Sequence, residues 1–187
     1  MRILITNDDG IQGEGLQVLT RWARHLGDVT VMAPKVEQSA KSHGIEIRHP
    51  FEVRRVDYMP GVRAYTVDST PADCVRYAVL GREEQYDLVL SGVNRGLNIG
   101  RDIIYSGTVA AVMEAAYLGI PAIAFSTEPE SFRSAWENLP PIFELMTGYR
   151  MLEKNPVYNV NIPLEVRGRP DHPAGRPVFF RSVPPHR

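Results

Sequence analysis

The chain has 187 residues, 43% of them hydrophobic and 9% aromatic, which is enough for one domain with a sizeable core. Its formal net charge is -1 and its arginines are scattered, so it lacks the basic stripe of a nucleic-acid-binding protein, and no apolar stretch approaches the ~20 residues of a membrane helix. The single cysteine, Cys74, excludes an intrachain disulfide and a cysteine-based zinc site, and we expect a soluble, cytoplasmic protein without a signal peptide.

The N-terminal third predicts a β-α-β unit. Residues 2–6 form an apolar run typical of a buried strand. Apolar residues then recur at helical spacing over residues 14–26, which predicts an amphipathic helix. A second apolar run at residues 29–33 predicts a strand parallel to the first, joined to it by a right-handed crossover.

The next segment predicts shorter elements. After a polar loop at residues 34–43, three runs at residues 45–48, 51–56 and 63–67 read as short strands that form an antiparallel excursion from the sheet. Pro71 stands at the favoured first position of a helix, which we expect to reach Leu80. Cys74 lies in this helix, where a buried thiol is the expected role.

The remainder alternates strands and helices. We expect strands at residues 87–90, 121–126 and 158–162, with a glycine- and asparagine-rich loop at residues 91–100 after the first of them. One helix begins after Thr108. Another covers residues 131–148, where the pair Pro140-Pro141 predicts a kink or two short helices. This alternation predicts an α/β fold with a mainly parallel sheet.

The end of the chain differs in composition. From residue 164 it is rich in proline and arginine, which indicates an extended or disordered arm, with a short strand at residues 178–180. We therefore expect an α/β domain over residues 1–163 and a C-terminal arm over residues 164–187.

Two adjacent carboxylates, Asp8 and Asp9, directly follow the first strand. Ligands of open α/β sheets bind just beyond the carboxyl ends of such strands, and buried acids require a positive partner. A divalent cation would supply one. A polar turn whose acids cap the following helix explains the same residues equally well.

Further polar residues follow other strands on the same predicted rim. Ser39 and Asn94 add two neutral oxygen donors to the two aspartates, a set that suits Mg²⁺ or Mn²⁺. Ser106-Gly107-Thr108 opens a helix, whose free N–H groups and dipole could hold a phosphate. Taken singly, each residue reads as a loop hydroxyl, a turn residue or a helix cap. Their joint placement favours phosphoryl chemistry.

Six motifs in family order over residues 1–163 make the chain similar to the SurE family of stationary-phase survival proteins, which are 5'/3'-nucleotidases. The motifs are Leu4-Ile5-Thr6-Asn7-Asp8-Asp9-Gly10, Ala33-Pro34 through Gln38-Ser39, Ser69-Thr70-Pro71-Ala72-Asp73-Cys74-Val75, Ser91-Gly92-Val93-Asn94-Arg95-Gly96, Tyr105-Ser106-Gly107-Thr108-Val109 and Asn159-Val160-Asn161-Ile162-Pro163.

The resemblance implies a Rossmann-like three-layer sandwich with a β-hairpin excursion and a C-terminal arm. It implies one divalent cation per subunit, Mg²⁺ or Mn²⁺, and a homodimer or homotetramer. The implied site residues are the metal ligands Asp8, Asp9, Ser39 and Asn94, of which the two aspartates are catalytic, and the substrate-binding residues Asn94, Asn98, Ser106, Gly107 and Thr108.

The resulting hypothesis is a metal-dependent phosphoric monoester hydrolase acting on nucleoside 5'- or 3'-monophosphates, with exopolyphosphatase activity on the same site as a side reaction. The alternative is a metal-dependent nucleotide-binding or assembly module with little turnover. Two departures from the family motivate it. Residues 40–44 replace a glycine-rich run, and only a proline- and arginine-rich stretch follows Pro163.

Overall fold

The computed structural model describes residues 1–129, 132–164 and 179–180. Its strands are β1 (Arg2–Thr6), β2 (Asp28–Pro34), β3 (Val53–Val56), β4 (Arg63–Val67), β5 (Leu88–Arg95), β6 (Ala122–Thr127), β7 (Val157–Ile162) and β8 (Phe179–Phe180). They form one eight-stranded sheet in the order β3-β4-β2-β1-β5-β6-β7-β8. The strands from β4 to β7 in this order run parallel, while β3 and β8 pair antiparallel at the two edges. The predicted α/β fold with a mainly parallel sheet is confirmed.

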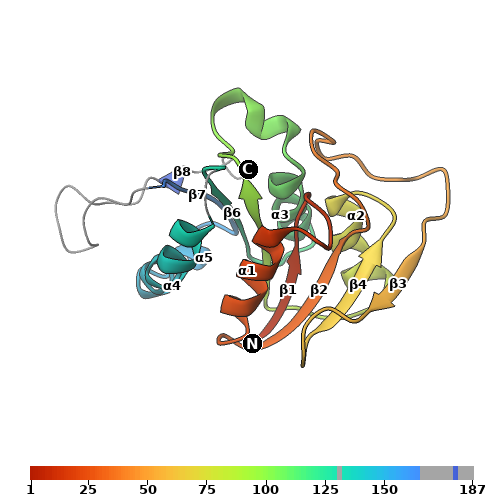
Figure 1. Cartoon of the computed structure of the whole chain (residues 1–187), viewed down its shortest axis with the longest axis horizontal. Coiled ribbons are helices and arrows are strands. Elements are labelled where there is room, and N and C mark those ends of the chain that lie inside the picture. The colour runs from red at the N-terminus through yellow and green to blue at the C-terminus, as the bar shows by residue number, and fades with distance from the viewer. Residues whose placement is uncertain (130–131, 165–178, 181–187) are drawn as a thin grey trace.

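Helices cover both faces of the sheet (Figure 1). They are α1 (Glu14–Ala23), α2 (Pro71–Arg76), α3 (Gly107–Tyr117), α4 (Arg133–Gly148) and α5 (Met151–Lys154), with a π-helical turn η1 (Tyr77–Gly81) and a 3-10 helix η2 (Gly100–Tyr105). Side chains alternate along β1, so Ile3 and Ile5 pack in the core with α1 and α4, while Leu4 packs in the core with α2 and α3. The result is the expected three-layer sandwich.

The order of the strands reverses beside β1. From β1 the chain proceeds outward to β2, reaches the edge at β3 and turns back to β4 beside β2; it then crosses to the other side of β1 with β5 and continues to β6 and β7. The boundary between β1 and β5 is therefore a topological switch point, where loops from the two halves of the sheet diverge and leave a crevice. Asp8 and Asp9 follow β1 at this boundary.

β5 is longer than the sequence suggested. The predicted strand ended at Leu90 with a loop after it, but β5 continues to Arg95, with a shift of register against β6 between Ser91 and Asn94. Gly92 makes the continuation possible: its φ is +126°, and a Cβ there would stand 2.3 Å from the carbonyl oxygen of Phe125. The irregular strand carries Asn94 to the carboxyl end of the sheet.

Three helix predictions differ from the structure in detail. The helix predicted over residues 14–26 ends as α1 at Ala23, because the next turn tightens to i→i+3 bonds such as Leu26 N–H to the Ala23 carbonyl, 2.9 Å. The helix expected from Pro71 to Leu80 divides into α2 and the wider turn η1. Pro140 and Pro141 do not divide α4, whose buried face packs in the same core as α1 and holds the helix together despite the missing N–H groups.

The strand predicted at residues 45–48 is wrong. This segment pairs with no strand, because its backbone groups bond to side chains instead, as in the bond from Glu46 N–H to Asp73 Oδ2, 2.8 Å. The other two short strands exist as β3 and β4. They form the expected hairpin, but β4 also pairs parallel with β2, so the hairpin extends the main sheet.

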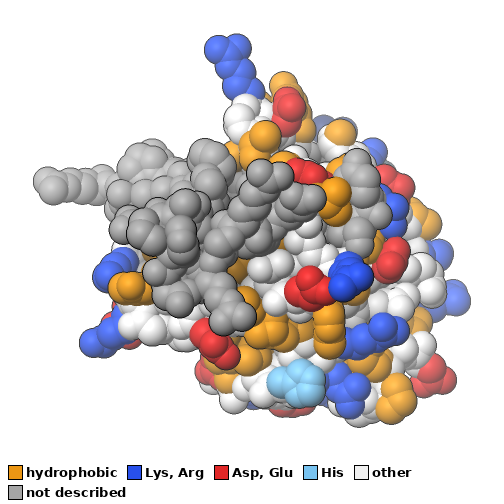
Figure 2. Space-filling model, turned by 60° about the vertical axis from the view of Figure 1, so that its left-hand side comes forward, with side chains coloured by type: hydrophobic (Ala, Val, Ile, Leu, Met, Phe, Trp, Pro, Cys, Tyr) orange, Lys and Arg blue, Asp and Glu red, His pale blue; other side chains and the backbone are white. Residues whose placement is uncertain are grey.

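Most of the predicted C-terminal arm lies outside the described residues, apart from the backbone of β8, which confirms a short strand within residues 178–180. In the described part of the chain, no helix has the length and apolar character of a membrane span. On the face drawn in Figure 2, acidic and basic side chains are interspersed and neither sign forms a continuous patch.

The core on the α1 side of the sheet includes a group of three aromatic rings. The Trp22 ring stands edge-on to the rings of Phe125 and Phe143, with 6.1 Å and 5.4 Å between ring centroids, and Phe125 is fully buried.

We predict that Phe125→Ala lowers the free energy of unfolding by about 3–5 kcal/mol in urea titrations, because it leaves a cavity among these rings. Tyr117, which is 81% exposed, provides the control: Tyr117→Ala should change the free energy of unfolding by no more than about 0.5 kcal/mol. If Phe125→Ala lowered the free energy of unfolding no more than Tyr117→Ala does, this description of the core would be wrong.

Candidate active site

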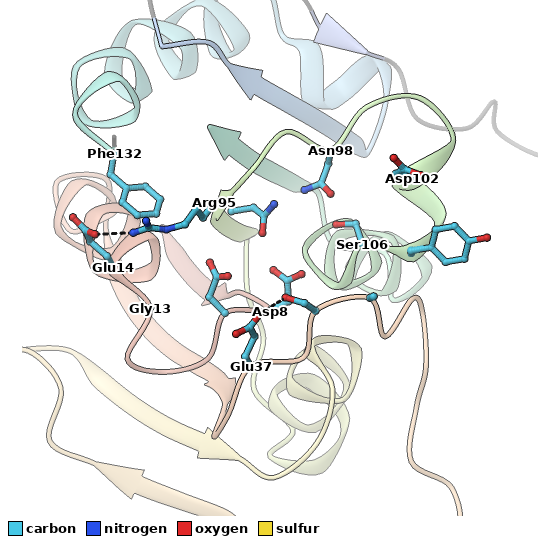
Figure 3. Close-up of a pocket in the computed structure, with 14 residues that line it drawn as sticks. Asp8, Gly13, Glu14, Glu37, Arg95, Asn98, Asp102, Ser106 and Phe132 are labelled. Atoms are coloured by element: carbon cyan, nitrogen blue, oxygen red, sulfur yellow. Dashed lines mark hydrogen bonds and ion pairs between the residues drawn. The ribbon is translucent and has the colours of Figure 1, made fainter. Parts of the chain in front are cut away.

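A pocket of about 500 Å³ opens at the carboxyl ends of β1, β2 and β5, at the switch point of the sheet (Figure 3). Six of the eight residues that sequence reasoning assigned to the site line it: Asp8, Asp9, Ser39, Asn94, Asn98 and Ser106. The other two, Gly107 and Thr108, are buried beside it against Asp8. Loops that are far apart in the sequence thus meet at one place.

Asp8 is fixed by the first turn of α3. Its side chain is 4% exposed, and its Oδ1 atom accepts a hydrogen bond from the Thr108 hydroxyl. Gly107 is required by this packing, because a Cβ there would stand 2.8 Å from the Asp8 Cβ. The positive end of the α3 dipole therefore faces the Asp8 carboxylate, which stabilises a negative charge at that point. The carboxylate oxygens of Asp8 keep lone pairs for a further partner.

Two neutral oxygen donors stand near the aspartates. The Ser39 hydroxyl donates to Glu37 Oε1 at 2.6 Å, so its oxygen keeps lone pairs for another partner. Asn94 Nδ2 donates to the Gly96 carbonyl at 2.7 Å, which fixes the amide and leaves its oxygen as the available acceptor. Both residues present oxygen to the pocket, as a hard cation requires.

An asparagine cluster holds the opposite wall. Asn98 is 8% exposed, and its backbone N–H donates to Asn161 Oδ1 at 2.8 Å while its carbonyl accepts from Asn159 Nδ2 at 2.8 Å. Its own Nδ2 donates to Ser126 Oγ at 2.8 Å. The motif at residues 159–163 thus acts from β7, where its two asparagines clamp the loop that presents Asn98 to the pocket.

The pocket is strongly acidic. Among its described lining residues are five carboxylates, Asp8, Asp9, Glu14, Glu37 and Asp102, and one guanidinium, that of Arg95. Burial raises the pKa of Asp8, more than its hydrogen bond from Thr108 lowers it. Burial, with the charges of Asp8 and Glu37, raises the pKa of Asp9 to about 6 from its ordinary 3.8. Both shifts mean that the charged aspartates lack a positive partner strong enough to offset their burial.

Arg95 contacts Asp9 through a backbone hydrogen bond, while its guanidinium is engaged by Glu14 and Phe132. Its Nη2 lies 3.1 Å from Glu14 Oε2, and its guanidinium carbon lies 5.1 Å from the centre of the Phe132 ring (Figure 3). Its charge lowers the pKa of Asp9, but by less than burial and the neighbouring carboxylates raise it. The protein therefore supplies one cation at the edge of the pocket and leaves the charge at its floor uncompensated.

The donor set fits a hard divalent cation. Asp8 and Asp9 offer two charged oxygens, and Ser39 and Asn94 offer two neutral ones, which is the kind of partial oxygen shell that Mg²⁺ and Mn²⁺ complete with water. In the described part of the chain no three histidine, cysteine, aspartate or glutamate side chains cluster as a metal site, so a softer, histidine- or cysteine-rich centre is not formed there.

Sequence reasoning missed several lining residues. Glu37 could have been found, because it lies two residues before Ser39 on the same loop. Phe132 and Asp102 belong to segments without a distinctive local pattern, and only the fold brings them to the pocket. His43, on the same loop as Ser39, does not line the pocket; its Nε2 lies 2.7 Å from Glu114 Oε2.

Comparisons with known proteins bear on the family and the fold. The family model of Survival protein SurE matches residues 3–176. The 5'-nucleotidase SurE of Thermoanaerobacter sp. (strain X514) is 42% identical over 167 residues, covering 87% of this chain and 66% of the relative. That of Paramagnetospirillum magneticum is 45% identical over 171 residues, covering 87% and 64%.

A solved structure shares the fold. The crystal structure of the SurE protein from Aquifex aeolicus superposes with a TM-score of 0.71 at 31% identity, over 96% of this chain and 81% of that one. The chain spans slightly less than two thirds, 66%, of the length of the Thermoanaerobacter relative. Since the family model covers nearly all of the chain, from residue 3 to residue 176, the chain belongs to the SurE family of survival proteins.

Proposed function

We propose that the chain is a divalent-metal-dependent phosphomonoesterase that hydrolyses nucleoside 5'- or 3'-monophosphates to nucleoside and phosphate. The observation that carries the proposal is the pair of uncompensated carboxylates at the switch point of the sheet, Asp8, which is buried, and Asp9, which is half-buried. The names of the matched relatives, 5'-nucleotidase SurE, support the substrate class.

In this proposal one Mg²⁺ or Mn²⁺ per subunit is held by Asp8, Asp9, Ser39 and Asn94. When bound, such a cation polarises a phosphoryl group and lowers the pKa of water. The chain's own part is to supply oxygens in a fixed arrangement, since Thr108 orients Asp8 and the Gly96 carbonyl orients Asn94. Without a cation the five carboxylates of the pocket would repel a phosphate, so the acidity of the site itself argues for one.

Residues on the opposite wall would bind the phosphoryl oxygens. Asn98 and Ser106 lie on the same side of the pocket in Figure 3, and Ser106 is the N-cap of α3. Their polar groups and the positive end of the α3 dipole would stabilise the charge that develops on the phosphoryl oxygens. Arg95 would supply a donor from the other side. The binding and orientation of the phosphate would thus use Arg95 at the end of β5, Asn98 in the loop that follows, and Ser106 at the start of α3.

We propose water as the nucleophile. It attacks phosphorus in line with the ester oxygen, the phosphorus–ester bond breaks, and the nucleoside leaves with a proton. Attack by Asp8 itself is the alternative, but a carboxylate that accepts the Thr108 hydroxyl and binds the proposed cation would be a weaker nucleophile. Phosphate trapped covalently on Asp8 with a slow substrate would overturn this choice.

The same site could accept the terminal phosphate of polyphosphate, so exopolyphosphatase activity belongs to the proposal as a side reaction. The homodimer or homotetramer and the division into residues 1–163 and an arm at 164–187 also remain predictions, since the described structure contains one chain and only two residues of the arm beyond Leu164.

The first prediction concerns phosphate release from nucleoside 5'- and 3'-monophosphates. We expect release with Mg²⁺ or Mn²⁺, none with EDTA, and a reduction of more than about 100-fold in Asp9→Asn, because even residues behind a metal ligand typically contribute 10- to 100-fold. Asp57→Asn, an exposed aspartate outside the pocket, is the matched control and should keep full activity.

Two outcomes would count against the proposal. A fully active Asp9→Asn variant would remove the metal assignment. Metal-dependent nucleotide binding without phosphate release, from folded protein, would favour the alternative of a binding or assembly module. Adding polyphosphate and a generic aryl phosphate to the panel would rank the side activity against the nucleotides.

The second prediction concerns the stability of the metal-free chain. The pKa of Asp9 is about 6 when folded and has an ordinary value of 3.8, so between these values the folded chain binds more protons than the unfolded one. Stability therefore falls as the pH rises through this range. In EDTA at pH 7.5, Asp9→Asn should melt a few degrees above wild type, and the difference should shrink at pH 4. A lower melting temperature for Asp9→Asn at pH 7.5 would mean that Asp9 has a stabilising partner within the chain.

A further inference from the structure

The segment 39–46 begins at Ser39 in the pocket and contains no helix or strand. Ala40 and Ser42 adopt left-handed φ values of 59° and 55°, which cost energy in residues other than glycine. A segment of this kind keeps its shape only where other parts of the structure hold it. Its contacts therefore decide whether Ser39 and Glu37 stay beside the aspartates.

The first anchor is Glu114, a 4% exposed glutamate two turns along α3. Its Oε2 lies 2.7 Å from His43 Nε2, and its Oε1 accepts from Arg76 Nη1 at 2.8 Å. Burial raises the pKa of Glu114, but the hydrogen bonds from His43 and Arg76 outweigh this effect and hold the pKa below its usual value. A charged, doubly bonded carboxylate thus joins the segment to α2 and α3.

The second anchor is the start of α2, in the motif at residues 69–75 that the pocket itself does not use. The Thr70 hydroxyl donates to the Gly44 carbonyl at 2.7 Å. Asp73 Oδ2 accepts the Glu46 N–H at 2.8 Å and the Ser69 hydroxyl at 2.5 Å. The motif therefore binds the far end of the segment and caps its own helix with the same side chains.

The third contact joins the segment to η2. Ser42 donates its backbone N–H to the Tyr105 carbonyl at 3.0 Å and its hydroxyl to the Ile104 carbonyl at 2.6 Å. At the near end, Gln38 N–H donates to the carbonyl of Asp8 at 2.7 Å. The segment is thus attached to the elements on both sides of the pocket.

We propose that Glu114, His43 and Arg76 form a positioning cluster that holds segment 39–46, and through it Ser39 and Glu37, against the aspartate pair. His43 does not line the pocket and its Nε2 is engaged by Glu114, so it acts on the site through the segment and not by contact with a substrate. The expected effect on the affinity for a cation rests on the proposed function, whereas the attachment of segment 39–46, called the tether below, does not.

The test uses the full chain with His43→Ala, His43→Gln and His25→Ala. Glutamine keeps an N–H donor near the position of Nε2, so it should rescue the contact. His25, an exposed histidine in the turn after α1 and outside segment 39–46, is the matched control. Hydrogen exchange of the amides of Lys41, Ser42, Gly44 and Glu46, all bonded in the structure, reports the tether in metal-free protein.

In His43→Ala we expect exchange at these amides to rise at least about tenfold, with no change in the strands β1 and β5. We also expect the Kd for Mn²⁺, measured by calorimetry, to rise about tenfold, because ligand supports typically contribute 10- to 100-fold. His43→Gln and His25→Ala should stay within about twofold of wild type in both measurements.

Unchanged exchange at these amides in His43→Ala would overturn the positioning cluster. So would a general rise in exchange, β1 and β5 included, because that is the signature of a merely structural residue. A failure of the proposed function looks different: wild-type protein would neither bind Mn²⁺ nor release phosphate. The exchange measurement would then still show whether His43 holds segment 39–46 in place.

Discussion

The removal of two adjacent carboxylates from water at the end of β1, Asp8 fully and Asp9 in part, is the constraint on which the rest of the site depends. A charged aspartate in a largely buried position is costly unless hydrogen bonds or an opposite charge offset the lost hydration. For Asp8 the protein uses the Thr108 hydroxyl and the positive end of α3, which also explains why a glycine must stand at position 107. For Asp9 it offers little, and the nearest cation, Arg95, is paired with Glu14. The remaining demand for positive charge is what a divalent cation would meet.

The architecture then explains how distant residues reach this place. Strand order reverses between β1 and β5, so a crevice opens there, and the irregular course of β5 past Gly92 brings Asn94 to its edge. Two supports act from behind. The asparagines of β7 clamp the loop of Asn98, while α2 and α3 hold the segment that starts at Ser39. Motifs that do not line the pocket thus stabilise the loops that do.

The sequence was informative where a residue's role follows from its own strand or helix. Apolar runs predicted the buried strands, and polar residues just after them predicted four of the pocket's lining residues, Asp8, Asp9, Ser39 and Asn94. It failed where distant contacts decide. Residues 45–48 look like a strand but bond to α2, Pro140 and Pro141 look like a break but α4 continues against the core, and Phe132 reaches the pocket only through the fold. Backbone geometry at Gly92, which extends β5, is also invisible to hydrophobic patterning.

The central claim is that Asp8 and Asp9 together hold one divalent cation. The most direct test is a calorimetric titration of Mn²⁺ into metal-free protein at pH 7.5, with Asp9→Asn titrated in parallel. We expect one Mn²⁺ site per chain in the wild type and a loss of most of the affinity for Mn²⁺ in Asp9→Asn. Wild-type protein that is folded but binds no Mn²⁺ or Mg²⁺, or a variant that binds as tightly as wild type, would contradict it.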